Sequence, residues 1–398
     1  MNWPTIPLAE VAPAKPQKAQ VCGGDQTVWQ VTLDHIESGS GRLLQRNLRP
    51  LSEAGSSTHW FDTRHVLYSK LRPYLNKVLL PDQEGLGTTE LVPLLPDEGR
   101  LDREYLAHYL RSESFVGWVS NQTAGAKMPR VAMTQFWNHE IPLPPLAEQK
   151  CIAAILDKAD SLRQKRAQAI QLADEFIRSV FLDMFGDPVL NPMKWKTKPL
   201  KALCDIRGGG TPSKSVASYW NGDIPWVSPK DMGQDTIIDS QDRITKTAVK
   251  ESSTQLIEPG SILMVVRSGV LKHRLPLAMN LRTVALNQDM KAFVPGCEVE
   301  PSFLLYALKA GSRHLLSTVR ATTADNLSSD VVHGYSMILP ELSLQKKFSL
   351  VVQHYAQLRK SLRKSTPDFD DAFKSLSQSA FEGKLENLRG PSASFLER

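Results

Sequence analysis

Two pairs of short stretches carry the residue types that could recognise nucleic-acid bases. Arginine and lysine pair with guanine, asparagine and glutamine pair with adenine, and further basic residues hold phosphates. The stretches are YSKLRPY and NQTAGAKMPR in the first half, and VRSGVLKHR and RATTADN in the second. The candidates are Lys70, Arg72, Asn121, Gln122, Lys127 and Arg130, then Arg267, Lys272, Arg274, Arg320, Thr322, Thr323 and Asn326, with Lys214 and Lys230 for phosphate. The alternative for each residue is an ordinary solvated surface group.

Motifs for catalysis by the chain itself are missing from the sequence. An adenine methyltransferase needs an Asn/Asp-Pro-Pro-aromatic stretch, and Asp187-Pro-Val and Asn191-Pro-Met do not meet that need. Gly208-Gly-Gly210 lacks the Gly-Lys-Ser/Thr ending of a phosphate loop, which favours a tight turn. Pro367-Asp368 with Glu382-Gly-Lys384 resembles a nuclease signature but falls on and after a helical pattern. We therefore predict a non-catalytic chain.

A metal site is also not predicted. The four cysteines form no CxxC pair, and the nine histidines show no i, i+4 pair of the kind that binds a metal ion. This cysteine usage indicates a reducing, cytoplasmic setting. We see neither a signal peptide nor an uncharged apolar run of the roughly 18 residues that a membrane span needs.

The candidate stretches recur because the chain is a tandem duplication. LPPLAEQK at 143–150 returns as LPELSLQK at 339–346, displaced by 196 positions. Further matches at this displacement are Leu162-Arg163 with Leu358-Arg359, Asp174 with Asp370, Ser179 with Ser375 and Phe185 with Phe381. An ordered series of matches at one displacement indicates an internal repeat. With 398 residues, the chain is long enough for two domains and their connectors.

Each half contains a mixed segment of short strands and helices followed by one long helix. Residues 66–71 and 261–266 are strand-like, while 104–110 and 302–308 have the pattern of a short helix. The prolines of the repeated motif end the mixed segment, since the residue before a proline avoids the helical region. The motif is therefore predicted to be the junction between a domain and a long helix.

The long helices carry apolar residues at alternating spacings of three and four, which is the seam of a coiled coil. We expect helices of about 35 residues, or about 50 Å, that pack against each other antiparallel. The predicted seam is Ile152, Ile155, Leu162, Phe176 and Val180, with Phe348, Val351, Leu358, Leu362 and Leu376. The alternative is two separate amphipathic helices that each pack on their own domain. Residues 365–368 interrupt the second seam, so we expect a kink or short break there, with Thr366 capping a new start.

The net charge of +6 and the pI near 9.0 suit a nucleic-acid partner without demanding one. With the motifs above, the sequence resembles the specificity subunit of type I restriction-modification systems. The resemblance is carried by the two junction motifs, by FLDMFGD at 181–187, and by GGTPS and YWNGDIPWVS in the second half. The first half lacks both of the last two motifs.

The resemblance implies an α+β fold: two tandem mixed α/β target recognition domains joined by two long antiparallel helices that form a coiled coil with pseudo-two-fold symmetry. The expected boundaries are 1–143 and 188–339 for the recognition domains, with long helices at 144–187 and 340–386. Each domain would read one half of a bipartite site in double-stranded DNA, and the helices would set the spacing.

The resemblance also implies the partners. Two modification subunits, which are adenine methyltransferases, would bind S-adenosylmethionine, and restriction subunits would use ATP and Mg. The chain itself would bind no cofactor and would not associate with a membrane. Two alternatives stay open at this point. One is a self-sufficient methyltransferase or nuclease, and the other is a coiled-coil protein-interaction adaptor without DNA binding.

Overall fold

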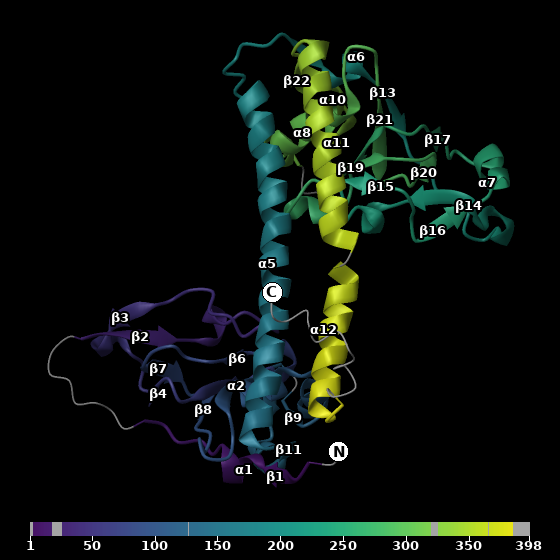
Figure 1. Cartoon of the computed structure of the whole chain (residues 1–398). Helices are drawn as coiled ribbons and strands as arrows, with labels where there is room; N and C mark the ends of the chain where they lie inside the picture. The colour runs from purple at the N-terminus through teal and green to yellow at the C-terminus, as the bar shows by residue number, and fades with distance from the viewer. Residues whose placement is uncertain (1–2, 18–25, 126, 320–324, 365, 385–398) are drawn as a thin grey trace, which may run out of the picture. The chain divides into compact units, whose positions relative to one another are not determined.

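The structure is a computed structural model that describes residues 3–17, 26–125, 127–319, 325–364 and 366–384 (Figure 1). It divides into two compact units. Unit 1 comprises residues 1–167 and 364–398, and unit 2 comprises residues 168–363. The long helix α5, Leu146–Phe185, belongs to both units and runs unbroken for 40 residues, close to the predicted length.

The described residues of unit 1 form short sheets and four short helices in addition to its part of the long helices. A four-stranded sheet has the order β3-β2-β7-β4, a three-stranded sheet has the order β6-β5-β8, and β1-β11 and β9-β10 are two-stranded. The strands are β1 Thr5–Pro7, β2 Thr27–Val31, β3 Leu48–Pro50, β4 Thr58–Phe61, β5 Val66–Ser69, β6 Val78–Leu79, β7 Gly85–Thr88, β8 Leu91–Leu94, β9 Thr123–Ala124, β10 Arg130–Val131 and β11 Glu140–Pro142. The helices are α1 Leu8–Val11, α2 Arg103–Arg111, α3 Glu113–Ser120 and α4 Met133–Asn138, with the 3-10 turns η1 Leu33–His35, η2 Leu51–Glu53 and η3 Pro73–Leu75.

Unit 2 repeats this plan with a wider second sheet. Its sheets have the orders β16-β14-β20-β17, β13-β21-β18-β19-β15 and β12-β22. The strands are β12 Thr197–Pro199, β13 Cys204–Gly208, β14 Trp220–Val227, β15 Thr236–Ile237, β16 Asp242–Ile244, β17 Leu256–Ile257, β18 Ile262–Val265, β19 Leu277–Asn280, β20 Val284–Leu286, β21 Met290–Pro295 and β22 Ser336–Ile338. The helices are α6 Leu200–Leu203, α7 Lys246–Glu251, α8 Pro301–Ala310, α9 Ser312–Ser317 and α10 Ser329–Gly334, with the 3-10 turns η4 Ala217–Tyr219, η5 Pro229–Asp231 and η6 Gly269–Lys272.

The strand pairing bears out the duplication. In the four-stranded sheets, β2 pairs with β7 parallel and β14 pairs with β20 parallel, while both outer pairs of each sheet are antiparallel. The predicted strands and short helices at matching places are present as β5, β18, α2 and α8. Unit 2 extends its second sheet with β13 and β15, whereas the described residues of unit 1 form an isolated bridge between Ala14 and Leu94 at the place of β13.

In each unit α5 packs beside a C-terminal helix (Figure 1). In unit 2 its carboxyl half meets α11, Leu342–Lys364. The ring centroids of Phe185 and Phe348 lie 5.6 Å apart, and Arg359 pairs with Asp174 at 3.1 Å. In these two contacts the residue number rises along α5 as it falls along α11, so the two helices are antiparallel. In unit 1 the amino half of α5 shares a core with α12, Thr366–Phe381. Ser365, where a break was predicted, lies outside the described residues.

The predicted seam holds only in part. Ile152 and Phe348 are fully buried, and Ile155, Val180, Val351, Leu362 and Leu376 are partly buried. The prediction is wrong for Leu162, Phe176 and Leu358, whose exposed fractions are 50%, 61% and 53%. The buried residues of α5 in unit 2 are instead Ile177, Phe181 and Phe185, spaced four apart, because the helix packs against its globular domain as well as against α11. A straight helix drifts by about 20° per heptad from a coiled-coil seam, which moves the inward stripe off the predicted positions.

The glutamine of each repeated motif, Gln149 or Gln345, joins two helix starts through hydrogen bonds, and we call this arrangement the glutamine clamp. Gln149 is fully buried, accepts from the amide of Asp102 at 2.8 Å, and donates to the carbonyls of Arg100 and Pro144 at 2.9 and 2.8 Å. Asp102 caps α2, so the glutamine joins the start of that helix to the start of α5. Gln345 makes the same three contacts in unit 2, accepting from Glu300, which caps α8, and donating to Glu298 and Pro340.

Aromatic rings join the far ends of the long helices to the same short helices. Phe381 contacts Tyr105 of α2 with ring centroids 5.4 Å apart, and Phe185 contacts Phe303 of α8 at 4.9 Å. Burying one such side chain stabilises the fold by about 1.5–3 kcal/mol. In each unit, α2 or α8 is therefore the element on which the domain and the long helices meet.

Candidate nucleic-acid interface

The two candidate stretches of unit 1 lie against each other. Leu71 and Arg130 form an isolated antiparallel bridge, the carbonyl of Lys70 accepts from the amide of Val131 at 2.9 Å, and the amide of Arg72 donates to Pro129 at 2.8 Å. Arg72 and Arg130 are exposed, and Lys70 is half-buried. We call residues 70–72 and 129–131 the bridged loops of unit 1.

The hairpin β9–β10 and the backbone of Arg72 shape this surface further. Lys127 is exposed in the turn between β9 and β10, where Gly125 has a φ of +99°, a conformation that favours glycine. Asn121 and Gln122 directly precede β9. Arg72 has a φ of 49°, in the left-handed region that non-glycine residues seldom adopt. Such backbone strain is typical of functional sites, where surrounding contacts hold it in place.

Unit 2 repeats this arrangement. Arg267 and Asn326 form an isolated antiparallel bridge, displaced by 196 positions from Leu71 and Arg130. The carbonyl of Val266 accepts from the amide of Leu327 at 2.8 Å, as Lys70 does from Val131. Residues 266–268 and 325–327 are the bridged loops of unit 2. Arg267 and Asn326 are exposed, whereas Arg320, Thr322 and Thr323 lie outside the described residues.

The remaining candidates of unit 2 lie on neighbouring or separate segments. Lys272 ends η6, with its Nζ 3.9 Å from Asp325 of the bridged loops. Arg274 donates to the carbonyl of Met232, the residue after η5, at 3.4 Å. Lys230 lies in η5 and pairs with Asp242 at 2.8 Å, and Lys214 is exposed in the segment after β13. Neither Lys214 nor Lys230 belongs to the bridged loops.

One acidic residue at the base of each pair of bridged loops was not predicted. The carbonyl of Glu90 accepts from the amide of Lys70 at 3.0 Å, and its carboxylate pairs with Arg130 at 2.8 Å. This pairing raises the pKa of the Arg130 guanidinium. In unit 2 the carbonyl of Asp289 accepts from Val266, and its carboxylate pairs with Arg267. The two acids are displaced by 199 positions, so a search at 196 misses them, although both directly precede a strand of the second sheet (β8, β21).

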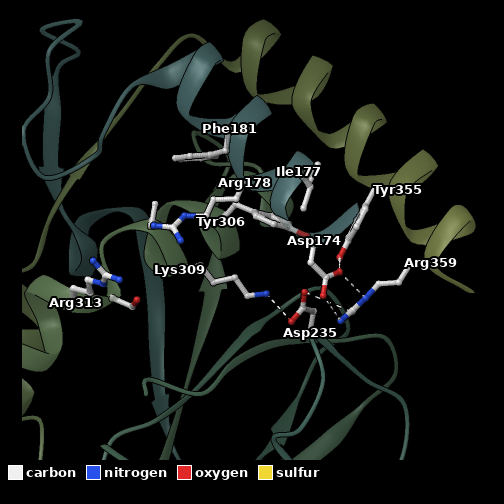
Figure 2. A pocket seen from close by; sticks show the side chains of 12 residues that line it. Asp174, Ile177, Arg178, Phe181, Asp235, Tyr306, Lys309, Arg313, Tyr355 and Arg359 are labelled. Atoms are coloured by element: carbon white, nitrogen blue, oxygen red, sulfur yellow. Dashed lines mark hydrogen bonds and ion pairs between the residues drawn. The ribbon is translucent and has the colours of Figure 1, made fainter. Parts of the chain in front are cut away.

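A second feature of unit 2 is a hollow of about 310 Å³ between the long helices and α8 (Figure 2). Arg359 pairs there with Asp174 and, at 3.7 Å, with Asp235, and Lys309 pairs with Asp235 at 2.6 Å. The Tyr355 hydroxyl donates to Asp174, and burial followed by this hydrogen bond raises the pKa of Tyr355. The hollow is thus lined by an ion-pair network that joins α5, α11 and the domain of unit 2.

Two general properties bear on the kind of site. Over the described ranges, no three or more His, Cys, Asp or Glu side chains gather in a way that could hold a metal ion. No helix in that part of the chain is long and apolar enough to span a membrane.

These features define a duplicated α+β protein with one pair of bridged loops in each unit. The type I restriction modification DNA specificity domain family matches residues 77–172 and 192–364, and the chain belongs to this family. It is a type I restriction-modification specificity subunit, as the sequence resemblance predicted.

Individual relatives agree with this assignment. The chain is 28% identical over 285 residues to the EcoR124I/EcoR124II specificity subunit of Escherichia coli, covering 68% of this chain and 67% of that protein. It is 29% identical over 178 residues to the MjaIX specificity subunit of Methanocaldococcus jannaschii, covering 44% and 40%.

Solved structures share the fold. A chain from the structural study of complex assembly and conformational transition of the type I R-M system aligns with a TM-score of 0.57 at 21% identity, over 96% of this chain and 98% of that chain. The S subunit of the type I system from M. genitalium aligns with a TM-score of 0.57 at 13% identity, over 96% of both chains.

Proposed function

We propose that each unit reads one half of a bipartite site in double-stranded DNA through its bridged loops, with recognition domains at 1–143 and 188–339. The long helices, at 144–187 and 340–386, set the spacing between the half-sites. The observation that carries the proposal is the repetition of one backbone arrangement, Leu71 with Arg130 and Arg267 with Asn326, beneath exposed side chains that suit DNA.

The residue types divide by role. Arg72, Arg130 and Arg267 suit guanine, whose O6 and N7 accept two hydrogen bonds from one guanidinium. Asn121, Gln122 and Asn326 suit adenine, which takes a donor and an acceptor from one amide. Lysines hold phosphates as point charges. The residues proposed to contact DNA phosphates are Lys70, Lys127, Lys214, Lys230, Lys272 and Arg274.

The chain in this proposal recognises DNA and performs no chemistry. Two modification subunits bind it and methylate adenine with S-adenosylmethionine, and restriction subunits with ATP and Mg join the complex. The duplicated units support two equivalent partners, because two copies of one surface accommodate two copies of one subunit. The net charge of +6 is too small for tight binding through phosphates by this chain alone. We therefore expect weak DNA binding without the modification subunits and tight binding with them.

Exchange of one recognition domain tests the proposal. Residues 1–143 are replaced by those of another specificity subunit, the chimera is expressed with the modification subunits, and methylated adenines are mapped by genome sequencing. We expect one half of the methylated sequence to change and the other half to stay the same. A change in both halves would mean that the two units form one composite reader. No sequence-specific methylation by the unaltered complex would favour the adaptor alternative.

A single substitution tests the same proposal at one loop. Arg267→Ala is expected to weaken recognition of one half-site by about 1–3 kcal/mol, the usual contribution of a bidentate arginine–guanine pair. Sequence preference at the other half-site stays unchanged, because distant sites without shared partners act additively. Binding titrations with duplexes altered in either half-site measure this. Equal losses for both half-sites would contradict it.

A further inference from the structure

Each pair of bridged loops has an acidic residue at its base that contacts the first loop through its backbone carbonyl. In unit 1 the backbone of Glu90 holds Lys70, and both of its carboxylate oxygens accept from Arg130, at 2.8–3.3 Å. In unit 2 the carbonyl of Asp289 accepts from Val266 and Arg267 at 2.9 and 3.2 Å, and its carboxylate accepts from Arg267 Nε at 2.6 Å. Each acid thus holds the first loop through its backbone carbonyl and an arginine through its carboxylate, and in unit 1 that arginine belongs to the second loop.

A carboxylate at this place needs a physical reason. Beside a duplex it repels phosphates, and it neutralises an arginine that would otherwise strengthen binding. Its effect on folding stability is small, since the side chains of Glu90 and Arg130 are 26% and 45% exposed and solvent screens exposed ion pairs. The pair instead fixes the orientation of the guanidinium. In unit 1, Nε and Nη2 of Arg130 donate to the two oxygens of Glu90, and a guanidinium held in this way keeps one plane and one set of free N–H donors. In unit 2, Nε and Nη2 of Arg267 lie 2.6 and 2.5 Å from the single oxygen Oδ1 of Asp289.

We propose that Glu90 and Asp289 are positioning residues that determine specificity, each by orienting one arginine of the bridged loops toward the bases. This inference rests on the proposed function, because it requires those loops to face DNA. It implies that the acids lower affinity for DNA in general and raise discrimination between sequences. The two units use different arginines for this, one from the second loop (Arg130) and one from the first (Arg267).

The test uses the full chain assembled with its modification subunits and carrying Glu90→Gln. The amide keeps the size of the side chain and leaves the backbone bond to Lys70 in place. Asp82→Asn is the matched control in unit 1, because Asp82 also pairs with an arginine, Arg46, at 2.6 Å, but lies outside the bridged loops. Both variants raise the net charge by one. Affinity for a specific duplex and for one of unrelated sequence is measured over a range of salt concentrations.

We expect the ratio of specific to non-specific affinity to fall about 5- to 150-fold for Glu90→Gln, the span of one arginine–base pair. Non-specific affinity is expected to stay equal or to rise, because a negative charge has been removed. Asp82→Asn should leave the ratio unchanged. Asp289→Asn should lower the ratio for the other half-site only. An unchanged ratio for Glu90→Gln, or an equal fall for Asp82→Asn, would overturn the inference.

A double-mutant cycle separates an action through Arg130 from direct contact of Glu90 with a base. If Glu90 acts through Arg130, then Glu90→Gln combined with Arg130→Gln lowers the ratio no further than Arg130→Gln alone, and both single variants affect the same base pairs. Additive losses would mean that Glu90 reads DNA itself, which also overturns the inference. If the unaltered complex has no sequence preference, the proposed function has failed. If the unaltered complex is sequence-specific and the Glu90→Gln variant is equally specific, only the positioning role is refuted.

Discussion

Units 1 and 2 share a backbone framework but differ in the charges placed on it. The glutamine clamp, the ring contact at the helix end and the bridge between loops recur in both units. Near the long helices, Arg163 pairs with Asp160 and lies 4.9 Å from the ring of Phe373, and Arg359, 196 positions later, pairs with Asp174 and Asp235. The charges differ at the bridge between the loops, where Arg130 of unit 1 corresponds to Asn326 of unit 2. The duplicated fold thus keeps its buried hydrogen bonds while charged side chains on the loops change.

The bridged loops differ in the same manner. In unit 1 the candidate cations Lys70, Arg72, Lys127 and Arg130 accompany the acid Glu90. In unit 2 the described candidate cations Arg267, Lys272 and Arg274 accompany the acids Asp289 and Asp325. Because the shared framework fixes only where the loops lie, each unit is free to read its own sequence. The predictions that follow test what is shared and what differs.

The largest effect is expected from the shared clamp. Gln149→Ala and Gln345→Ala should each lower the free energy of unfolding by about 2–4 kcal/mol, since each leaves a buried amide and two carbonyls without their partner and opens a small cavity. Denaturant unfolding of the full chain measures this. Gln353→Ala, on an exposed position of α11, is the control and should change stability by less than about 0.5 kcal/mol. A loss as small as that of the control would show that the clamp is not a structural element.

An intermediate effect should separate the two units. Arg359→Met removes the cation between Asp174 and Asp235 and should lower the stability of unit 2 by about 1–3 kcal/mol, because its side chain is only 15% exposed. Arg100→Met, which removes an exposed ion pair with Glu10 in unit 1, should lower stability by only about 0–1 kcal/mol. High salt should reduce this difference through screening. Equal losses at low salt would mean that the ion-pair network of unit 2 has no special stabilising role.

The smallest effect concerns pH and unit 1. Burial lowers the pKa of His139 to about 4, against the weaker opposing effect of Glu140, and the ring contacts the Tyr109 hydroxyl at 2.9 Å. The unfolded chain takes up a proton near pH 6.5 while the folded chain does not, so stability is greatest above pH 6.5 and falls toward pH 4. Tyr335, 196 positions later, cannot replace this titration, because burial raises its pKa to about 12.

Thermal unfolding at pH 7 and pH 5 checks this expectation. The unaltered chain should lose about 1 kcal/mol more than His139→Gln between these pH values, less than the full pKa shift because the ring is partly exposed. Tyr335→Phe is the control in unit 2 and should show the same pH dependence as the unaltered chain. If His139→Gln retains the full pH dependence, other groups are responsible for it.

Periodicity and repetition in the sequence determined a large part of this protein. The 196-residue displacement predicted which elements correspond, and the prolines before α5 and α11 predicted where those helices begin. The same displacement relates the two bridges, since Leu71 and Arg130 of unit 1 correspond to Arg267 and Asn326 of unit 2. Such features depend on local backbone preferences and on the repeat, and both are visible along one chain.

Contacts between distant segments were decided only by the tertiary structure. Leu162, Phe176 and Leu358 carry the seam pattern but are exposed, because the inward face of each helix depends on the domain beside it. The junction glutamines and the acids Glu90 and Asp289 have no local pattern that reveals their partners, which lie about 20 to 50 positions away in the chain. A side chain's hydrogen-bond partners are set by where packing brings other segments, and only the folded chain specifies that.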